Sequence, residues 1–364
     1  MSEVASLPLG QPLLSLCLSP DLFFAAIGGR DVMKIVAITP DGIFDRKALR
    51  VAAKGNVKSS IADVAWSHAD SSNGLIAAAM TSGAVAIWDI NQAARMAQAA
   101  SHPTGGGGGN GSGPSGSRGV RALGKGVGAR FGIGIALGGS GATAGGGGGG
   151  GGGVGGVTLG GLQSDRVLAE HQRAVNRVAW HPADANILLS CSQDNTLRMW
   201  DKRGRSVSCQ LTFRPKSDGV RDAQFSPAHP DRFAAAFDNG MLQVWDRRKA
   251  HQPELKLMAH SQPLMAIDWH PRREWTIATG SRDRTVKAWD LSCFGWGDTK
   301  PQSALPTHTV HCVQPVGRVK WRPQHVYQIA TAPGTGDSDT FIYDVRQPFV
   351  PLAVLEPATG RSRP

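Results

Sequence analysis

Residues 171–201 read HQRAVNRVAWHPADANILLSCSQDNTLRMWD, and residues 260–290 read HSQPLMAIDWHPRREWTIATGSRDRTVKAWD. Each stretch opens with a histidine, carries a turn aspartate 23 residues later and ends with a tryptophan six residues after that aspartate, followed by Asp. Two copies with identical spacing indicate a repeat. Repeats of this length are supersecondary units that bury a continuous core by packing against one another.

Trp-Asp marks the end of the unit and recurs along the chain. It occupies residues 88–89, 200–201, 245–246 and 289–290, with Tyr343-Asp344 as a fifth copy. From residue 200 onward the steps are 45, 44 and 54 residues. A second aromatic precedes the five copies by 20 or 22 residues, at Trp66, Trp180, Phe225, Trp269 and Trp321. This period, with Trp-Asp at its end, is typical of a β-propeller blade.

The residues between the two markers predict strands. The apolar run 187–189 precedes the turn 193–195, and the alternating segment 197–200 follows it. Alternation of apolar and polar residues indicates a half-buried strand. We expect three strands up to Trp-Asp and a fourth after it, for example over residues 207–213.

The fold class is therefore all-β, a propeller of six recognisable blades. Residues 15–38 form a first copy without Trp-Asp. The predicted blades centre near residues 15–40, 60–95, 173–213, 219–258, 263–292 and 316–357.

A glycine-rich insert interrupts the repeat. Of the 47 glycines, 30 lie between residues 101 and 163, including an unbroken run at 145–153. Such a run loses too much conformational entropy on ordering to hold one structure. We expect the insert to lie between Asp89 and Glu170-His171, a segment that holds the last strand of blade 2 and the loop into blade 3. The predicted domains are blades 1–2 over 1–100, a disordered insert over 101–163, blades 3–6 over 164–357 and a disordered tail over 358–364.

The repeat resembles WD-type propeller blades, and this resemblance implies a structural network in two of them. Its predicted members are His171, Asp194 and Trp200 in one blade and His260, Asp283 and Trp289 in the other. The hydroxyl is supplied by Ser190 or Ser192 in the first and by Thr279 or Ser281 in the second. A buried Trp N–H, a hydroxyl and an imidazole each need a partner and can satisfy one another.

A catalytic triad is the alternative interpretation of His171, Asp194 and Ser190. The same set recurs in a second unit, which favours a structural role because repeats copy structure more readily than active sites. The blades ending at Trp88 and Trp245 lack the histidine and carry Ser82 and Asn239 at the aspartate position, so we expect them to be held less firmly.

The bulk composition narrows the function classes. The chain has 39 Lys and Arg against 28 Asp and Glu, a formal charge of +11, which suggests acidic partners. No apolar run reaches the 18 residues of a membrane-spanning helix, and residues 1–9 lack the basic start of a secretory signal. The five cysteines contain no C-x-x-C pair, so we expect reduced thiols in the cytosol or nucleus.

No cofactor or metal site is predicted. Residues 119–126 approach a phosphate-binding loop but end in Gly126, which has no hydroxyl for Mg²⁺. His308, His311 and Cys312 have no second group of ligands at a useful spacing.

Several stretches resemble one known family in particular. They are residues 175–201, 219–226, 237–245, 311–314, 318–323 and 344–351. The last run, DVRQPFVP, is not a general feature of WD repeats. These stretches are similar to the family of WD-repeat subunit 24 of the GATOR-type (SEA) nutrient-signalling complexes, and the resemblance covers residues 15–95 and 166–357.

That resemblance implies a propeller scaffold without chemistry of its own. The family's complex sits at the lysosomal or vacuolar surface and relieves inhibition of the TOR kinase complex when amino acids are plentiful. Its propeller has seven blades, followed by a helical solenoid and a Cys/His zinc domain. We therefore expect an incomplete seven-bladed propeller, which is either a fragment or a chain that recruits a blade from a partner. A closed six-bladed ring is the alternative.

The predicted function is a non-catalytic protein–protein scaffold that promotes TOR signalling in response to amino acids. Its expected partners are other protein subunits, without a small-molecule substrate, nucleic acid or membrane insertion. Its expected place is the cytoplasm, peripherally at the lysosomal or vacuolar membrane through those partners. The alternative is a nucleic-acid- or chromatin-associated propeller, supported by the charge and by basic turns at 202–203, 247–249 and 272–273.

Overall fold

The computed structural model describes residues 13–30, 33–50, 59–69, 74–91, 162–204, 208–293, 305–334 and 339–355. The chain divides into two compact units, one of residues 1–98 with 160–364 and one of residues 99–159. All described residues belong to the first unit. The predicted disordered tail at 358–364 and most of the predicted insert lie outside the described residues.

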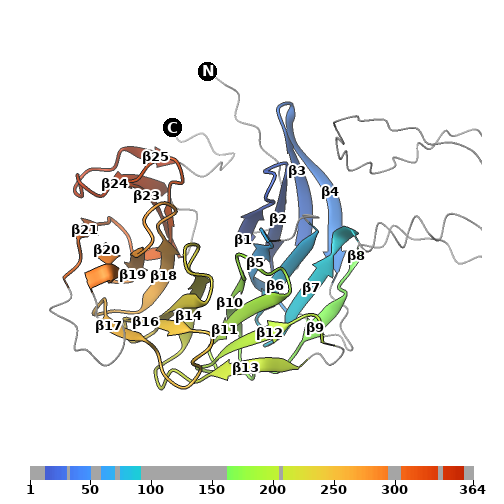
Figure 1. The fold of residues 1–364 in the computed structure, drawn as a ribbon. Coiled ribbons are helices and arrows are strands. Elements are labelled where there is room, and N and C mark those ends of the chain that lie inside the picture. The colour runs from blue at the N-terminus through green and yellow to red at the C-terminus, as the bar shows by residue number, and fades with distance from the viewer. Residues whose placement is uncertain are drawn as a thin grey trace, which may run out of the picture. The chain divides into compact units, whose positions relative to one another are not determined.

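The described residues form six sheets of short strands (Figure 1). Blade 1 contains β1 (Leu13–Leu18), β2 (Phe24–Gly29), β3 (Met33–Thr39) and β4 (Gly42–Arg50), with β8 (Leu162–Gln163) parallel to β4. Blade 2 contains β5 (Ile61–Trp66), β6 (Leu75–Met80), β7 (Val85–Asp89) and β9 (Arg166–Leu168). Blade 3 contains β10 (Val175–Trp180), β11 (Ile187–Ser192), β12 (Leu197–Asp201) and β13 (Cys209–Phe213).

The remaining three sheets follow the same order. Blade 4 contains β14 (Val220–Phe225), β15 (Arg232–Phe237), β16 (Met241–Asp246) and β17 (Leu255–Met258). Blade 5 contains β18 (Leu264–Trp269), β19 (Thr276–Ser281), β20 (Thr285–Asp290) and β21 (His308–His311), with a 3-10 turn η1 (Leu291–Cys293) after β20. Blade 6 contains β22 (Val316–Trp321), β23 (Gln328–Pro333), β24 (Thr340–Asp344) and β25 (Ala353–Leu355).

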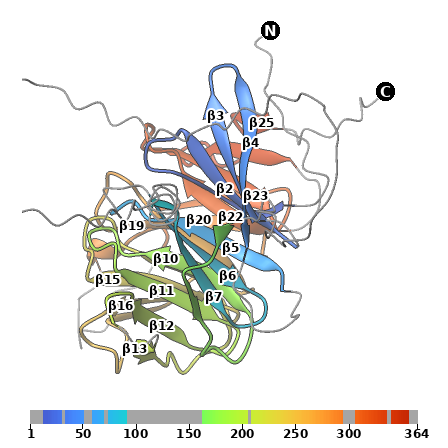
Figure 2. The ribbon, with the colours of Figure 1, turned by 90° about the vertical axis from the view of Figure 1, so that its right-hand side faces the viewer.

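The first four strands of each sheet run antiparallel to one another, and the first strands of successive sheets pack together. The contacts run from β1 to β5, β10, β14, β18 and β22 in succession (Figures 1 and 2). This arrangement is a β-propeller. The predicted fold class is confirmed, with all six predicted blades present.

The second strand of each blade shows why this sequence forms a propeller. In β6, β11 and β19 all six residues are buried, on both faces of the sheet. A blade between two neighbours is covered on both sides, so its middle strand is uniformly apolar or small instead of alternating. The core accordingly divides into five clusters, each made of side chains from two successive blades.

The insert interrupts blade 2, and this corrects the predicted boundary at residue 164. We predicted an insert over 101–163, within the segment that holds the last strand of blade 2 and the loop into blade 3, with blades 3–6 from residue 164. Instead Leu162–Gln163 form β8 beside β4, and Arg166–Leu168 form β9, the outer strand of blade 2. An outer strand of three residues carries little hydrophobic pattern, and closure entropy grows only logarithmically with loop length. The sheet can therefore recruit this strand from beyond a long insert.

The turn between the second and third strands needs a left-handed residue. Gly83, Asn195, Gly240 and Arg284 occupy this position in blades 2 to 5, with φ of 90°, 63°, 81° and 63°. A Cβ at Gly240 would lie 2.1 Å from the carbonyl oxygen of His260. Glycine is required there for both its φ and its lack of a side chain.

Substitutions at two of these equivalent positions should have opposite effects. Gly240→Ala forces both a clash and a strained φ, so we expect a loss of at least about 2 kcal/mol of unfolding free energy. Arg284→Gly removes a left-handed non-glycine residue from an exposed turn, so we expect a gain of up to about 1 kcal/mol. Urea denaturation of both variants measures this, and equal shifts of the same sign would contradict it.

Candidate functional site

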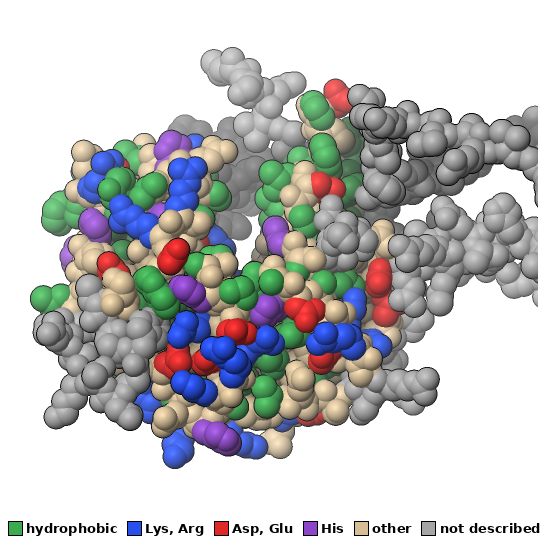
Figure 3. All heavy atoms as spheres, viewed as in Figure 1, with side chains coloured by type: hydrophobic (Ala, Val, Ile, Leu, Met, Phe, Trp, Pro, Cys, Tyr) green, Lys and Arg blue, Asp and Glu red, His purple; other side chains and the backbone are tan. Residues whose placement is uncertain are grey.

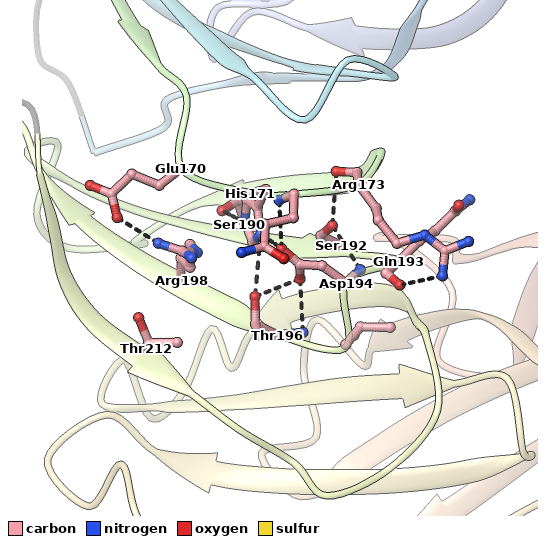
Figure 4. Close-up of polar contacts among 12 residues, drawn as sticks. Glu170, His171, Arg173, Ser190, Ser192, Gln193, Asp194, Thr196, Arg198 and Thr212 are labelled. Atoms are coloured by element: carbon pink, nitrogen blue, oxygen red, sulfur yellow. Dashed lines mark hydrogen bonds and ion pairs between the residues drawn. The ribbon is translucent and has the colours of Figure 1, made fainter.

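Five polar side chains of blade 3 form a chain of hydrogen bonds, and Figure 4 labels four of them, His171, Ser190, Asp194 and Thr196. Trp200 Nε1 donates to Ser190 Oγ at 2.8 Å, and Ser190 Oγ lies 2.8 Å from His171 Nε2. His171 Nδ1 lies 2.8 Å from Asp194 Oδ2. Thr196 Oγ1 donates to the other carboxylate oxygen at 2.6 Å. The structure thus brings together His171, Asp194 and Trp200, with Ser190 as the hydroxyl.

Blade 5 repeats the arrangement with a threonine in place of the serine. Trp289 Nε1 donates to Thr279 Oγ1 at 2.8 Å, and His260 Nε2 lies 2.8 Å from the same oxygen. His260 Nδ1 lies 2.8 Å from Asp283 Oδ2, and Thr285 Oγ1 donates to Asp283 Oδ1 at 2.7 Å. Of the two hydroxyl candidates in each blade, Ser190 and Thr279 are the ones that meet the imidazole.

The electrostatics favour a neutral imidazole beside an ionised carboxylate in blade 5. Burial lowers the pKa of His260, although Asp283 opposes the shift. Burial raises the pKa of Asp283, but hydrogen bonds from Thr285 and His260 outweigh burial and hold that pKa below its usual value. The hydroxyl then donates to Nε2 and the Nδ1–H donates to the carboxylate, so every polar atom in the chain has a partner.

Asp194 in blade 3 responds in the same way. Burial raises the pKa of its carboxyl, but hydrogen bonds from His171 and Thr196 outweigh it and hold that pKa well below its usual value.

The geometry does not offer a nucleophile to a substrate. Ser190 and Thr279 are wholly buried, and each hydroxyl oxygen already accepts a tryptophan N–H. A triad serine must expose its oxygen to an incoming carbonyl. The arrangement therefore ties the loop before the first strand to the second strand, to the turn that follows the second strand and to the third strand of one blade.

Blade 4 lacks this network and leaves a donor unsatisfied. Trp245 is fully buried between Phe213 and Phe233, and its Nε1 makes no hydrogen bond within the described residues. Asn239, at the aspartate position, bonds instead to Ser217 Oγ at 3.0 Å. An unpaired buried donor costs about 1–3 kcal/mol.

A second set of polar side chains joins one blade to the next, and we did not single it out from the sequence. Three of the six first strands carry an acceptor at the third residue and three carry one at the fifth, and these acceptors bind amides of the fourth and sixth residues of the following first strand. At the third position the pairs are Ser15 with Val64, Asp63 with Val178 and Asp222 with Ile267. At the fifth position they are Cys17 with Trp66, Gln224 with Trp269 and Asp268 with Trp321.

Arg177 takes the third position in blade 3 and acts as a donor. It donates to Asp222 at 2.8 Å and to Asp63 at 2.9 Å, so it links the carboxylates of the two adjacent blades. Burial lowers its pKa, but the two carboxylates more than compensate and the pKa is raised. The sequence does mark these polar residues by position: Asp63, Arg177 and Asp222 each lie three residues before the second aromatic of the repeat, Trp66, Trp180 and Phe225.

These first strands line a channel of about 650 Å³. Its wall combines Asp63, Arg177, Gln224 and Lys320 with apolar side chains of blades 1 to 4 and of blade 6. In the described part of the chain, no three His, Cys, Asp or Glu side chains gather as metal ligands would, and His308, His311 and Cys312 are no exception. No helix among the described residues is long and apolar enough to cross a membrane.

Comparison with known proteins gives one matching family and several relatives. The family model described as MIOS, WD40 repeat matches residues 162–344, half of the chain. GATOR2 complex protein WDR24 of Danio rerio is 31% identical over 352 residues, which cover 96% of this chain and 35% of that protein. The Homo sapiens protein of the same name is 30% identical over 349 residues, which cover 96% of this chain and 34% of that protein.

A more distant relative carries another name. Restriction of telomere capping protein 1 of Eremothecium gossypii is 28% identical over 232 residues, which cover 52% of this chain and 17% of that protein. The chain spans about a third of the length of the WDR24 relatives that it matches.

Two tryptophan substitutions should separate the networked blade from the unsatisfied one. Trp200→Phe removes a hydrogen bond and leaves Ser190 Oγ without its donor, whereas Trp245→Phe removes a donor that has no partner. Both lose similar volume, so we expect Trp200→Phe to cost about 1–3 kcal/mol more unfolding free energy. Chemical denaturation of the pair measures the difference, and equal losses would disprove the stabilising role proposed for the network.

The stability should fall on acidification below neutral pH, in part through His260. Its folded pKa is depressed, so the unfolded chain binds more protons between the folded pKa and 6.5, and stability falls as pH decreases through that window. His260→Gln should flatten the fall of melting temperature between pH 7 and 5. The control is His251→Gln, on an exposed turn, which should leave the slope unchanged.

Proposed function

This chain belongs to the family described as MIOS, WD40 repeat, and we propose on that premise that it is a non-catalytic β-propeller scaffold of a nutrient-signalling complex. The observation that carries the proposal is the match along 96% of the chain, through all six blades, to proteins named as GATOR2 complex subunits. The wholly buried hydroxyls of the two blade networks support a role without chemistry.

The basic turns support protein contacts over nucleic-acid binding. Three of the turn arginines follow the aspartate that ends a third strand by two residues and pair with it, at 2.6 or 2.7 Å. The pairs are Asp201 with Arg203, Asp246 with Arg248 and Asp344 with Arg346. Hydrogen bonds from these arginines hold the pKa of each aspartate below its usual value.

Other basic residues of these turns are paired as well. Arg247 donates to Asp231, Lys249 lies 3.6 Å from Glu254, and the Arg273 guanidinium sits 5.0 Å above the Tyr327 ring. Figure 3 shows Lys and Arg side chains interspersed with Asp and Glu side chains on the face in view. Nucleic-acid binding draws on cations free to replace counterions at phosphates, and five of these basic side chains lie against carboxylates of this protein.

The proposed role includes promotion of TOR signalling in response to amino acids. The proposed place is the cytoplasm, peripherally at the lysosomal or vacuolar surface through partner subunits.

Affinity purification from the organism's own cells tests the scaffold. We expect a tagged chain to enrich subunits homologous to those of a GATOR2 complex, whereas an unrelated tagged propeller does not. The same material should bind RNA no more tightly than the control at 150 mM salt. Absence of those subunits, or RNA binding stronger than that of the control, would overturn the proposal.

A further inference from the structure

Charge is distributed unevenly between the two ends of the blades. At one end, five basic side chains of the turns lie against carboxylates, as described above. At the other end, the loop into each first strand meets the turn between the second and third strands, because these strands run antiparallel. We call the segments at this second end of blades 3 to 5 the loop face. They are residues 169–174, 193–196, 214–219, 238–240, 259–263 and 282–284.

The segments of the loop face contact one another from blade to blade. A Cβ at Gly219, in the loop into blade 4, would lie 3.9 Å from Asn195 Oδ1 in the turn of blade 3. A Cβ at Gly240, in the turn of blade 4, would lie 2.9 Å from the carbonyl oxygen of Gln262 in the loop into blade 5. The loop face is therefore one continuous surface across the three blades.

Basic side chains on the loop face are free of carboxylate partners. Five of them are exposed and make no ion pair within the described residues. One donates to a backbone oxygen instead, since Arg173 lies 3.4 Å from the carbonyl of Gln193 (Figure 4). The five are Arg173, Arg214, Lys216, Arg282 and Arg284.

The carboxylates of the loop face do not balance these cations. Four of its five carboxylates are bound by other side chains, and the fifth, Asp218, is the exposed one. The bound pairs are Asp194 with His171, Asp283 with His260, Asp238 with Arg221 and Glu170 with Arg198. Five exposed cations beside one exposed carboxylate give this face a positive potential, which attracts acidic ligands.

A pocket of about 370 Å³ lies beside this face, between blades 5 and 6. Its apolar wall includes Met265, Pro315 and Pro333, and Arg282 lines it as well. Its volume falls in the range of about 300–1,000 Å³ that is typical of ligand pockets, and methionine adapts its shape to different apolar groups. A ligand that carries an apolar side chain next to a carboxylate can therefore place both groups here.

These features favour an acidic peptide over a nucleic acid. The arginine fork matches both carboxylates and phosphates, so the charge alone does not distinguish them. Of the described residues that line the pocket, none is aromatic, so a nucleobase would have no ring to stack on. The ligand that uses both features is a polypeptide segment in which Asp or Glu residues flank a large apolar residue.

The stretches of this sequence outside the described residues do not supply such a segment. Each of them contains at most one Asp or Glu, and residues 92–161 contain none. The single carboxylates are Glu3, Asp31, Asp70, Asp298, Asp337 and Glu356. None of these stretches can therefore neutralise five cations.

We propose that the loop face of blades 3 to 5, with the pocket beside Arg282, binds an acidic segment of a partner protein. A large apolar side chain of that segment enters the pocket, and its flanking carboxylates pair with Arg282 and the neighbouring cations. This inference rests on the proposed scaffold function and names the kind of partner segment that the scaffold holds.

Selection from a random peptide library tests the chemistry of the ligand. The purified full chain is immobilised, and a displayed library of random peptides is selected on it at physiological salt. We expect the enriched peptides to carry Asp or Glu on both sides of Leu, Ile, Met or Phe. Enrichment without this acidic pattern, or no enrichment, would overturn the proposal.

A charge reversal locates the binding. Arg282→Glu should weaken binding of the enriched peptide about ten-fold or more, because it places like charges together. Arg272→Glu is the matched control, since Arg272 is also exposed on blade 5 but lies in the turn after the first strand, at the other end of the blade. It should leave the affinity unchanged. Equal effects of the two variants would contradict binding at the loop face.

Changes in the peptide test the same contacts without altering the protein. Replacing its apolar residue with serine should weaken binding about ten-fold or more, because a large apolar side chain is no longer buried. Replacing its Asp and Glu with Asn and Gln should abolish binding. An unchanged affinity in either case would refute the proposal. So would an oligouridylate RNA that binds the unmodified chain and is lost with Arg282→Glu.

Crosslinking in cells identifies the natural occupant. A photo-crosslinking residue is incorporated at position 314, which is exposed and lines the pocket, and at position 272 as a control. We expect the crosslink from position 314 to map onto a segment of another protein that contains Asp or Glu beside an apolar residue. Crosslinks to this protein's own chain, or none above the control, would each overturn the proposal.

The outcomes separate this inference from the scaffold function. If GATOR2 homologues co-purify while no acidic ligand depends on Arg282, the scaffold stands and the proposed use of the loop face is wrong. If acidic peptides bind through Arg282 while no such subunits co-purify, the loop face stands and the proposed scaffold function is wrong.

Discussion

The sheets of blades 2, 3 and 5 bury both faces of their second strands, so each of these blades depends on a neighbour at each side. The fully buried second strands β6, β11 and β19 show this requirement most directly. The five two-blade clusters hold most of the core, and the interior of a single blade holds little of it. The exposed face of β1 is an exception to this requirement, because it is apolar like the faces that the other blades bury.

Polar groups set the details of this packing in two directions. Within blades 3 and 5, a series of hydrogen bonds from the tryptophan to the aspartate fixes the turn after the second strand to the second and third strands of the same sheet. Between blades, side chains such as Asp222 bind amides of the next first strand and set its register. Buried polar groups of this kind stabilise only when fully satisfied, and Trp245 shows the local cost where the network is missing.

The blade repeat could be predicted from the sequence, because the Trp-Asp pairs recur at nearly regular spacing. His171 and Asp194 could be paired in advance for the same reason, since two copies share the spacing. The choice of Ser190 over Ser192 was beyond the sequence, because both lie on one strand and only the paired strands show which hydroxyl meets the imidazole. The predicted start of blade 3 at residue 164 was wrong, because the three residues of β9 carry too little pattern to show that they belong to blade 2.

By itself the sequence determined that these residues form an all-β propeller with six recognisable blades, because the period, the Trp-Asp markers and the strand alternation are local properties that repeat. Only the tertiary structure decided which blade the strand after the insert completes, that the basic turns are neutralised by their own aspartates, and that Asp63, Arg177 and Asp222 form one linked series across three blades. These are contacts between residues 45 or more positions apart, apart from the turn pairs, whose side-chain orientation is likewise set only by the folded hairpin. Spacing along the chain does not encode such contacts, because they arise from how complete blades pack side by side.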